Sequence, residues 1–242
     1  MPIESTIFLS AIAVVVAGCV RGFSGFGAGM VLVPILSLIY NPLVAVVTVV
    51  VLELIPTVQL LPGALKYCHW RSVIPMSLLA CISIPVGAML LIHIDAEIMR
   101  IWIACLILLC VFTLSIGWRY TGTDRYGNAS MLTGFSSGIM SGAAGLGGLP
   151  VILYYLSGSH TASVSRASMI VFLVVTTFIA LVTYLLHGIV TVEIAGFSVL
   201  LAPLFILATW AGKKMFGLVS DAIFRKAMLT MLGGIAIAML FA

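Results

Sequence analysis

The stretch Gly18-Cys-Val-Arg-Gly22-Phe-Ser-Gly25-Phe-Gly27 occurs twice in this chain, the second time in altered form. Its copy is Gly138-Ile-Met-Ser-Gly142-Ala-Ala-Gly145-Leu-Gly147, in which four glycines keep their places at an offset of 120 residues. A further pair, Asp95–Arg100 and Asp221–Arg225, repeats at an offset of about 125 residues. This pattern predicts a duplicated unit of about 120 residues, a common construction in membrane proteins that move solutes.

The composition excludes a soluble domain. Of the 242 residues, 63% are hydrophobic and 7% are charged, whereas soluble domains carry about 25% charged residues. Eleven Lys+Arg and seven Asp+Glu are too few to cover the surface of a globule. We therefore predict an all-α integral membrane protein, a single transmembrane domain over residues 1–242 with internal repeats at about 6–118 and 128–242.

Charge and cysteine content exclude further classes. The net charge of +4 comes without a dense basic cluster, which excludes nucleic acid as a partner. The five cysteines form no CxxC pair, and we expect buried small residues rather than disulfides or metal ligands. We predict no cofactor and no metal.

Eight apolar segments follow one another along the chain, and six have the roughly 20 residues that a helix needs to cross a bilayer. The first and fifth are longer, with 35 and 32 residues, and each carries one of the glycine clusters. We predict that both are interrupted at the glycines, as broken helices or re-entrant hairpins. The segments are approximately 6–40, 42–63, 73–94, 98–118, 128–159, 161–187, 194–213 and 222–242.

The basic residues at the segment ends decide the predicted topology, because cytoplasmic loops collect Lys and Arg. If all eight segments crossed, four of these residues would lie on one face and six on the other. If the two broken segments enter and leave on the same side, nine lie together and only Arg100 lies opposite. We therefore predict inverted repeats, each with a broken segment and three spanning helices, in a multi-pass protein of the cytoplasmic (inner) membrane with both termini outside.

A break in an intramembrane helix leaves backbone N–H groups without helical partners, and those that begin a half-helix carry partial positive charge. Such a break can hold an anion. In an inverted pair, the two breaks are expected to meet near the midplane as one site. Ser136 and Ser137 are further hydroxyl donors. The predicted substrate-binding residues are Arg21, Ser24, Gly25, Gly27, Gly29, Ser141, Gly145, Gly147, Gly148 and Arg166.

Three ionisable residues in apolar segments each have two interpretations, because charge inside a membrane is costly. Arg21 either attracts an anionic substrate, or it snorkels to the membrane interface or pairs with Glu53. Glu53 is the candidate for proton coupling, since an apolar setting favours a neutral carboxyl group, or else a structural partner for Arg21 or Arg166. Arg166 either lines an inner vestibule or is a flanking charge.

Helix packing is the alternative interpretation for some of the glycines. Gly134, Gly138 and Gly142 recur every four residues, which is typical of close helix contact. The tighter clusters around Gly27 and Gly147 do not follow helical spacing, so we expect them to line the breaks. The four histidines fall at segment ends, where an interfacial position is the expectation.

The repeats resemble the TauE/SafE family of sulfite and organosulfonate exporters. Tyr67–Arg71 also resembles a short aromatic-basic loop of that family. Arg21 departs from the pattern because it stands where the second half has Ser141, and this leaves the transported compound open. The resemblance is carried by Gly18, Gly22, Gly25, Gly27 and Gly29 with Pro34 downstream, and by Gly138, Gly142, Gly145, Gly147 and Gly148 with Pro150 downstream.

The resemblance implies a permease that exports a small sulfur-containing anion without ATP. Alternating access is the expected mechanism, with one half rocking against the other and a proton as the candidate coupling ion. The expected partners are the anionic substrate and the lipid bilayer, and a homo-oligomer is left open.

Three other functions compete with export. A passive anion channel would use the same polar breaks, and a scaffold would explain the glycine packing without Arg21 and Glu53. Gly22-Phe-Ser24-Gly25 matches the Gly-x-Ser-Gly pattern of intramembrane serine proteases, which need a histidine beside the serine. His187 falls at a segment end, and the position that copies Ser24 is Ala144. We therefore predict that the protein is not an enzyme.

Overall fold

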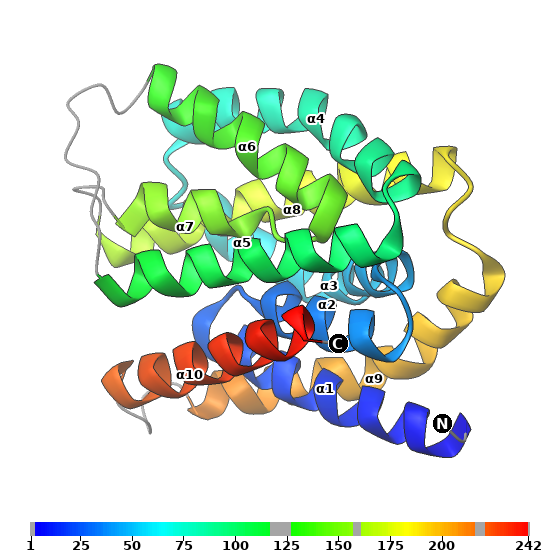
Figure 1. Ribbon diagram of the computed structural model, residues 1–242. Helices are drawn as coiled ribbons and strands as arrows, with labels where there is room; N and C mark the ends of the chain where they lie inside the picture. Colours follow the sequence, from blue (N-terminus) through cyan, green and yellow to red (C-terminus); the bar gives the residue numbers. More distant parts are fainter. Residues whose placement is uncertain (1–2, 117–126, 157–160, 216–220, 242) are drawn as a thin grey trace. The chain divides into compact units, whose positions relative to one another are not determined.

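The computed structural model describes residues 3–116, 127–156, 161–215 and 221–241, and within these ranges all regular structure is helical (Figure 1). The all-α prediction is confirmed. The ten helices are α1 (Ile3–Ser24), α2 (Ala28–Ile39), α3 (Pro42–Leu65), α4 (Trp70–His93), α5 (Ala96–Ile116), α6 (Asn128–Ala144), α7 (Gly148–Leu156), α8 (Ala162–Leu186), α9 (Val192–Met215) and α10 (Asp221–Leu240).

Six of these helices are long and apolar enough to cross a membrane, namely α1, α3, α4, α5, α8 and α9. The chain is therefore a multi-pass membrane protein. This set of spanning helices differs from the six segments of spanning length in the sequence at its first and last members. The first segment does contain a spanning helix, because α1 alone has 22 residues and extends about 33 Å at 1.5 Å per residue. In α10, the apolar stretch found in the described residues covers only Leu229–Leu240.

Both long segments are interrupted where the glycines predicted a break. The first break (Gly25–Gly27) separates α1 from α2, and the second break (Gly145–Gly147) separates α6 from α7. These boundaries correspond residue by residue at the 120-residue offset. The arm before each break is the longer one, with 22 residues in α1 and 17 in α6.

The chain forms two compact units that do not coincide with the sequence halves. The first unit draws on residues 1–52, 94–116 and 190–242, and the second on residues 53–93 and 117–189. Helix α3 belongs to the first unit up to Leu52 and to the second from Glu53. Each unit thus combines helices from both halves of the sequence.

In the first unit, the main helix pair is α1 with α9, while α10 packs against α5 and α2. Glycines allow the close approach of α1 to α9. An added Cβ at Gly18 would come within 2.6 Å of the Ala208 Cβ, and one at Gly22 would overlap the backbone of Thr209. Gly212 of α9 lies against the Cys19 backbone in the same way. Small residues thus form this helix contact, as is common in membranes.

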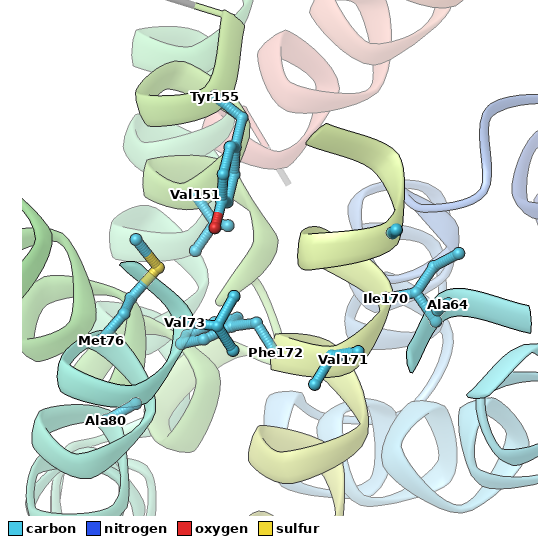
Figure 2. Close-up of a cluster of buried hydrophobic side chains, with 10 residues drawn as sticks. Ala64, Val73, Met76, Ala80, Val151, Tyr155, Ile170, Val171 and Phe172 are labelled. Atoms are coloured by element: carbon cyan, nitrogen blue, oxygen red, sulfur yellow. The ribbon is translucent and has the colours of Figure 1, made fainter. Parts of the chain in front are cut away.

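In the second unit, α4 packs against α6 and α8. An added Cβ at Gly134, Gly138 or Gly142 would meet the α4 backbone, which confirms that this stripe serves helix packing. Beside it lies a core cluster from four helices, shown in Figure 2. Its members are Ala64 of α3, Val73, Met76 and Ala80 of α4, Val151 and Tyr155 of α7, and Ala167, Ile170, Val171 and Phe172 of α8.

Candidate functional site

The first break is built from glycine conformations that other residues rarely adopt. Gly25 and Gly27 have φ of 82° and 90°, in the left-handed region where a Cβ is unfavourable. The Gly25 N–H donates to the Arg21 carbonyl at 2.8 Å and closes the last turn of α1. Gly27 caps α2 without any side-chain hydrogen bond. The chain thus ends one helix and begins another within three residues.

The start of α2 lies inside the protein. Ala28, Gly29 and Met30 form its first turn and are all buried. The first N–H groups of a helix have no partner within the helix, and none of these three residues is proline. This turn therefore brings a row of buried amide donors to the first break.

Arg21 lies in the last turn of α1 and is 2% exposed, so its side chain is buried in the protein and does not reach the membrane interface. This placement removes the snorkelling interpretation of Arg21. A buried guanidinium remains charged at any physiological pH. A permanent cation therefore lies one turn before the first break.

The second break begins with Gly145, which has φ 64° and ψ 16° and ends α6. Its N–H donates to the Ser141 carbonyl at 3.0 Å, and the Leu146 N–H donates to the Met140 carbonyl at 3.1 Å. The Leu149 N–H of α7 turns back to the Leu146 carbonyl at 3.1 Å. Backbone hydrogen bonds thus satisfy some of the N–H and C=O groups that lose their helical partners at the second break.

Two side-chain hydroxyl groups complete the second break. Ser137 of α6 donates to the carbonyl of Gly147. Tyr184 of α8, which is fully buried, donates to the carbonyl of Gly142 at 2.8 Å. One acceptor lies in the last turn of α6, and the other belongs to the residue directly before α7. Membrane interiors demand such partners because no water is available there.

The two glycines after the second break have different surroundings. A Cβ at Gly147 would come within 2.6 Å of the Ser141 Cβ, so Gly147 packs directly against α6. A Cβ at Gly148 would have nothing closer than Leu173 Cδ2 at 3.8 Å, an ordinary contact distance. Packing therefore requires glycine at 147 but not at 148.

The hydroxyl predictions near the second break are corrected in part. Ser136 donates to the carbonyls of Leu132 and Thr133 in its own helix, and Ser137 is engaged with Gly147. Neither hydroxyl proton is therefore directed to a ligand. Ser141 is 8% exposed and also lies beside Gly147, so Ser141 remains a candidate hydroxyl ligand at the second break. The side chain of Ser24 lies outside the described residues.

Two other predicted site residues belong to helices that do not form the breaks. Glu53 is partly buried in α3, three residues before Pro56, at the point where the second unit begins. Arg166 is partly buried in the second turn of α8. The basic residue predicted to lie alone on its face, Arg100, donates from Nη2 to the Ser37 carbonyl near the C-terminal end of α2.

The cysteine prediction is wrong in its burial. Only Cys110 is buried, whereas Cys105 is exposed and the other three are partly exposed. A thiol is apolar enough to contact lipid, so a cysteine in a spanning helix need not be buried in the protein. All five are free. Burial raises the pKa of the Cys68 thiol, and a hydrogen bond with Ser168 lowers it in part.

The described histidines mark helix ends, as predicted. His93 is the last residue of α4 and His187 caps α8, while His69 immediately precedes α4. Trp70 and Trp210 are exposed, and the Lys214 ammonium lies 3.7 Å from the centroid of the Trp210 ring. His160 and Trp118 lie outside the described residues. Within the described part, no three His, Cys, Asp or Glu residues are grouped to hold a metal.

Sequence reasoning missed Tyr184. One signal was available, because a phenol in an apolar span needs a hydrogen-bond partner. A backbone carbonyl at a predicted break would have been a natural choice. The sequence alone does not show that α8 passes the C-terminal end of α6.

Comparison with known proteins identifies the family. The sequence model of the family described as Sulfite exporter TauE/SafE matches residues 10–239 of the chain. No curated protein and no solved structure matches it. The family match covers both breaks and all the described site residues.

Proposed function

Since the chain belongs to the Sulfite exporter TauE/SafE family, we propose that it is a secondary transporter that exports a small anion of the sulfite or organosulfonate type. The family is one of transporters and not of enzymes, and the chain has the spanning helices that transport requires. The proposed mechanism is alternating access across the cytoplasmic membrane, with both termini outside as the charge distribution favours.

The observation that carries the proposal is the pair of interrupted helices in an almost uncharged chain. At the first break, the buried amides of Ala28, Gly29 and Met30 begin α2. At the second, Leu149 is engaged with Leu146 and Pro150 has no N–H. The donors that α7 offers an anion are therefore the amides of Gly147 and Gly148. Backbone amides at helix starts are established ligands for small oxyanions.

A charge supplements the amides of the first break, and a hydroxyl group supplements those of the second. Arg21, buried one turn before the first break, supplies a permanent positive charge. Ser141 supplies a hydroxyl group beside the second break. Gly25, Gly27 and Gly145 have positive φ, and in this proposal their backbone conformations direct the amide donors towards the anion. In this proposal Arg166 attracts the anion towards the site.

Glu53 is the proposed proton carrier. It is a carboxyl group in the middle of an apolar spanning helix, and it is partly buried. Protonation removes its charge, so the two protonation states differ greatly in their cost inside the membrane. A carboxyl group in this position can therefore couple proton movement to transport.

The sharpest test uses Gly148→Ala, because the structure leaves room for this methyl group. In the proposed site the methyl group would obstruct an anion that approaches the α7 amides, so we expect sulfite binding to weaken by about tenfold or more, the loss of a charge-assisted hydrogen bond. Isothermal titration of purified protein with sulfite measures this. The matched control is Gly63→Ala, a helix position with nothing within 4 Å of the added Cβ. Wild-type affinity in Gly148→Ala would contradict the proposed site.

Glu53→Gln tests the coupling and separates a carrier from a channel. In proteoliposomes, a pH gradient is expected to drive concentrative sulfite flux in the wild type but not in the variant. Sulfite binding should survive the substitution, because Glu53 is not a proposed ligand. Undiminished pH-driven flux in the variant would remove Glu53 from this role. Purely downhill flux in the wild type would favour a passive anion channel.

A further inference from the structure

The carbonyl groups at the second break present a problem for an anion site. The C-terminal end of α6 carries partial negative charge on its last carbonyl oxygens. These oxygens lie within a few residues of the α7 amides that would bind the anion. A bare carbonyl there would repel the anion and attract a cation. An interrupted helix is therefore not anion-selective by itself.

Side-chain hydroxyl groups cover one of these oxygens, that of Gly142, and the oxygen of Gly147, which directly precedes α7. Tyr184 Oη donates to the Gly142 carbonyl at 2.8 Å and lies 3.4 Å from that of Ser141. Ser137 Oγ donates to the Gly147 carbonyl. Each hydroxyl group has only one proton, so each of these protons is committed to a backbone oxygen. Both side chains are buried, with 0% exposure.

The main chain covers further oxygens of the same break. The Ser141 carbonyl accepts from the Gly145 N–H at 3.0 Å, and the Leu146 carbonyl accepts from the Leu149 N–H at 3.1 Å. Together with the two hydroxyl groups, these bonds engage the carbonyls of Ser141, Gly142, Leu146 and Gly147. These bonds lower the number of bare carbonyl oxygens beside the first turn of α7, where the amides of Gly147 and Gly148 are hydrogen-bond donors.

We infer that Tyr184 and Ser137 determine the charge selectivity of the second break, by masking carbonyl oxygens that would otherwise favour a cation. The inference rests on the proposed anion site and adds two selectivity-determining residues to it. Neither residue is a ligand in this account. Each acts through a backbone oxygen, Tyr184 through that of Gly142 and Ser137 through that of Gly147.

A purely structural role makes a different prediction. If the two hydroxyl groups only stabilise the helix ends, their removal lowers stability but leaves a folded variant with unchanged ionic preference. If they mask charge, a folded variant binds the anion more weakly and gains a response to small cations. A bare carbonyl oxygen is a hard ligand that suits Na⁺ better than a bulky organic cation.

The experiment measures sulfite binding to Tyr184→Phe and Ser137→Ala in sodium and in choline salts. In choline, we expect the affinity of each variant to fall about fivefold to tenfold, the effect of one unsatisfied buried acceptor. In sodium, the variants should recover part of this loss, whereas the wild type should bind equally in both salts. Thermal unfolding identifies the folded variants, and Ser137→Ala serves if Tyr184→Phe does not fold.

Two controls match the variants in chemistry. Tyr155→Phe removes a phenol of the same unit whose oxygen is hydrogen-bonded to the hydroxyl groups of Ser72, at 2.8 Å, and Ser168. Ser198→Ala removes a buried hydroxyl that donates to Ile194 within its own helix. Neither control should alter the ratio of the affinities in sodium and choline.

The outcomes separate the inference from the proposed function. If the wild type binds sulfite and the folded variants keep its affinity and its indifference to sodium, the masking inference is overturned and the anion site stands. An equal loss in Tyr155→Phe would also overturn it. If the wild type binds none of sulfite, thiosulfate and sulfoacetate, the proposed function fails and the inference fails with it.

Discussion

The two breaks have the same helix boundaries and glycine positions but differ in the side chains that surround them. Both follow a glycine-faced helix, and both begin the next helix at the same offset of 120 residues. The first has Arg21 where the second has Ser141. The second has Ser137 and Tyr184 bonded to backbone oxygens, and the positions that copy them in the first half are Ala17 and Ala64.

In the proposed transporter, this difference would give an interrupted helix a positive character in two ways. The first break adds a full positive charge and keeps an amide on every residue at the start of α2. The second break removes negative character by engaging its carbonyls, and it has fewer amides because Pro150 stands where the first half has Met30. The following predictions test whether the breaks are alike in packing and unlike in binding.

The largest effect is expected where the breaks are alike. Gly22→Leu and Gly142→Leu would each force a side chain into a facing backbone, that of Thr209 and Lys213 for one and that of Ile84 and Ala88 for the other. Overpacking typically lowers the free energy of unfolding by about 1–3 kcal/mol. We expect both variants to lose at least the upper value, because the facing atoms are backbone and cannot change rotamer. The yield of monodisperse protein and its unfolding temperature measure this.

Gly196→Leu is the control for both packing variants, since nothing lies within 4 Å of a Cβ added there and the residue is exposed. It should unfold at the wild-type temperature. A stable, well-behaved Gly22→Leu variant would show that α1 and α9 do not depend on their close approach, and the two breaks would then differ in packing as well.

Arg21→Ser makes the first break resemble the second and tests the role of the buried charge. Loss of a charge-assisted hydrogen bond is expected to weaken sulfite binding about tenfold to a hundredfold. Arg21→Lys should recover part of this loss, because it restores the charge without the guanidinium geometry. Titration calorimetry on the three proteins gives the affinities. Equal affinity in Arg21→Ser would mean that Arg21 serves the fold and not the anion.

The smallest effect on sulfite affinity is expected for Pro150→Ala, which makes the second break more like the first. It returns an N–H group to the first turn of α7, and one additional hydrogen bond should raise sulfite affinity about twofold to fivefold. Pro203→Ala, at an exposed proline within α9, should leave the affinity unchanged. An unaltered affinity in Pro150→Ala would show that the anion does not use this turn.

Local sequence patterns predicted the local structure well. The glycine clusters predicted both breaks because positive φ and close approach are demands on single residues. The four-residue spacing of Gly134, Gly138 and Gly142 predicted a packed helix face for the same reason. Helix ends at His93 and His187 followed from the limits of apolar segments.

Contacts between distant parts of the chain were beyond such patterns. The role of Tyr184 depends on the passage of α8 beside α6, and the hydroxyl of Ser137 depends on the turn after Gly145. The exposure of the cysteines depends on which helix faces are covered. Periodicity identifies an apolar helix, but in a chain with 63% hydrophobic residues it does not show which faces meet protein and which meet lipid.

The exchange of helices between the sequence halves has a consequence for biosynthesis. Helix α1 finds its main partner in α9, and about 170 residues separate the end of one from the start of the other. At the roughly 5–20 residues per second of a translating ribosome, this interval lasts on the order of 10–30 s. Throughout that time a nascent helix that carries Arg21 must be kept in the lipid or at the insertion machinery, and the first unit closes only when translation is nearly complete.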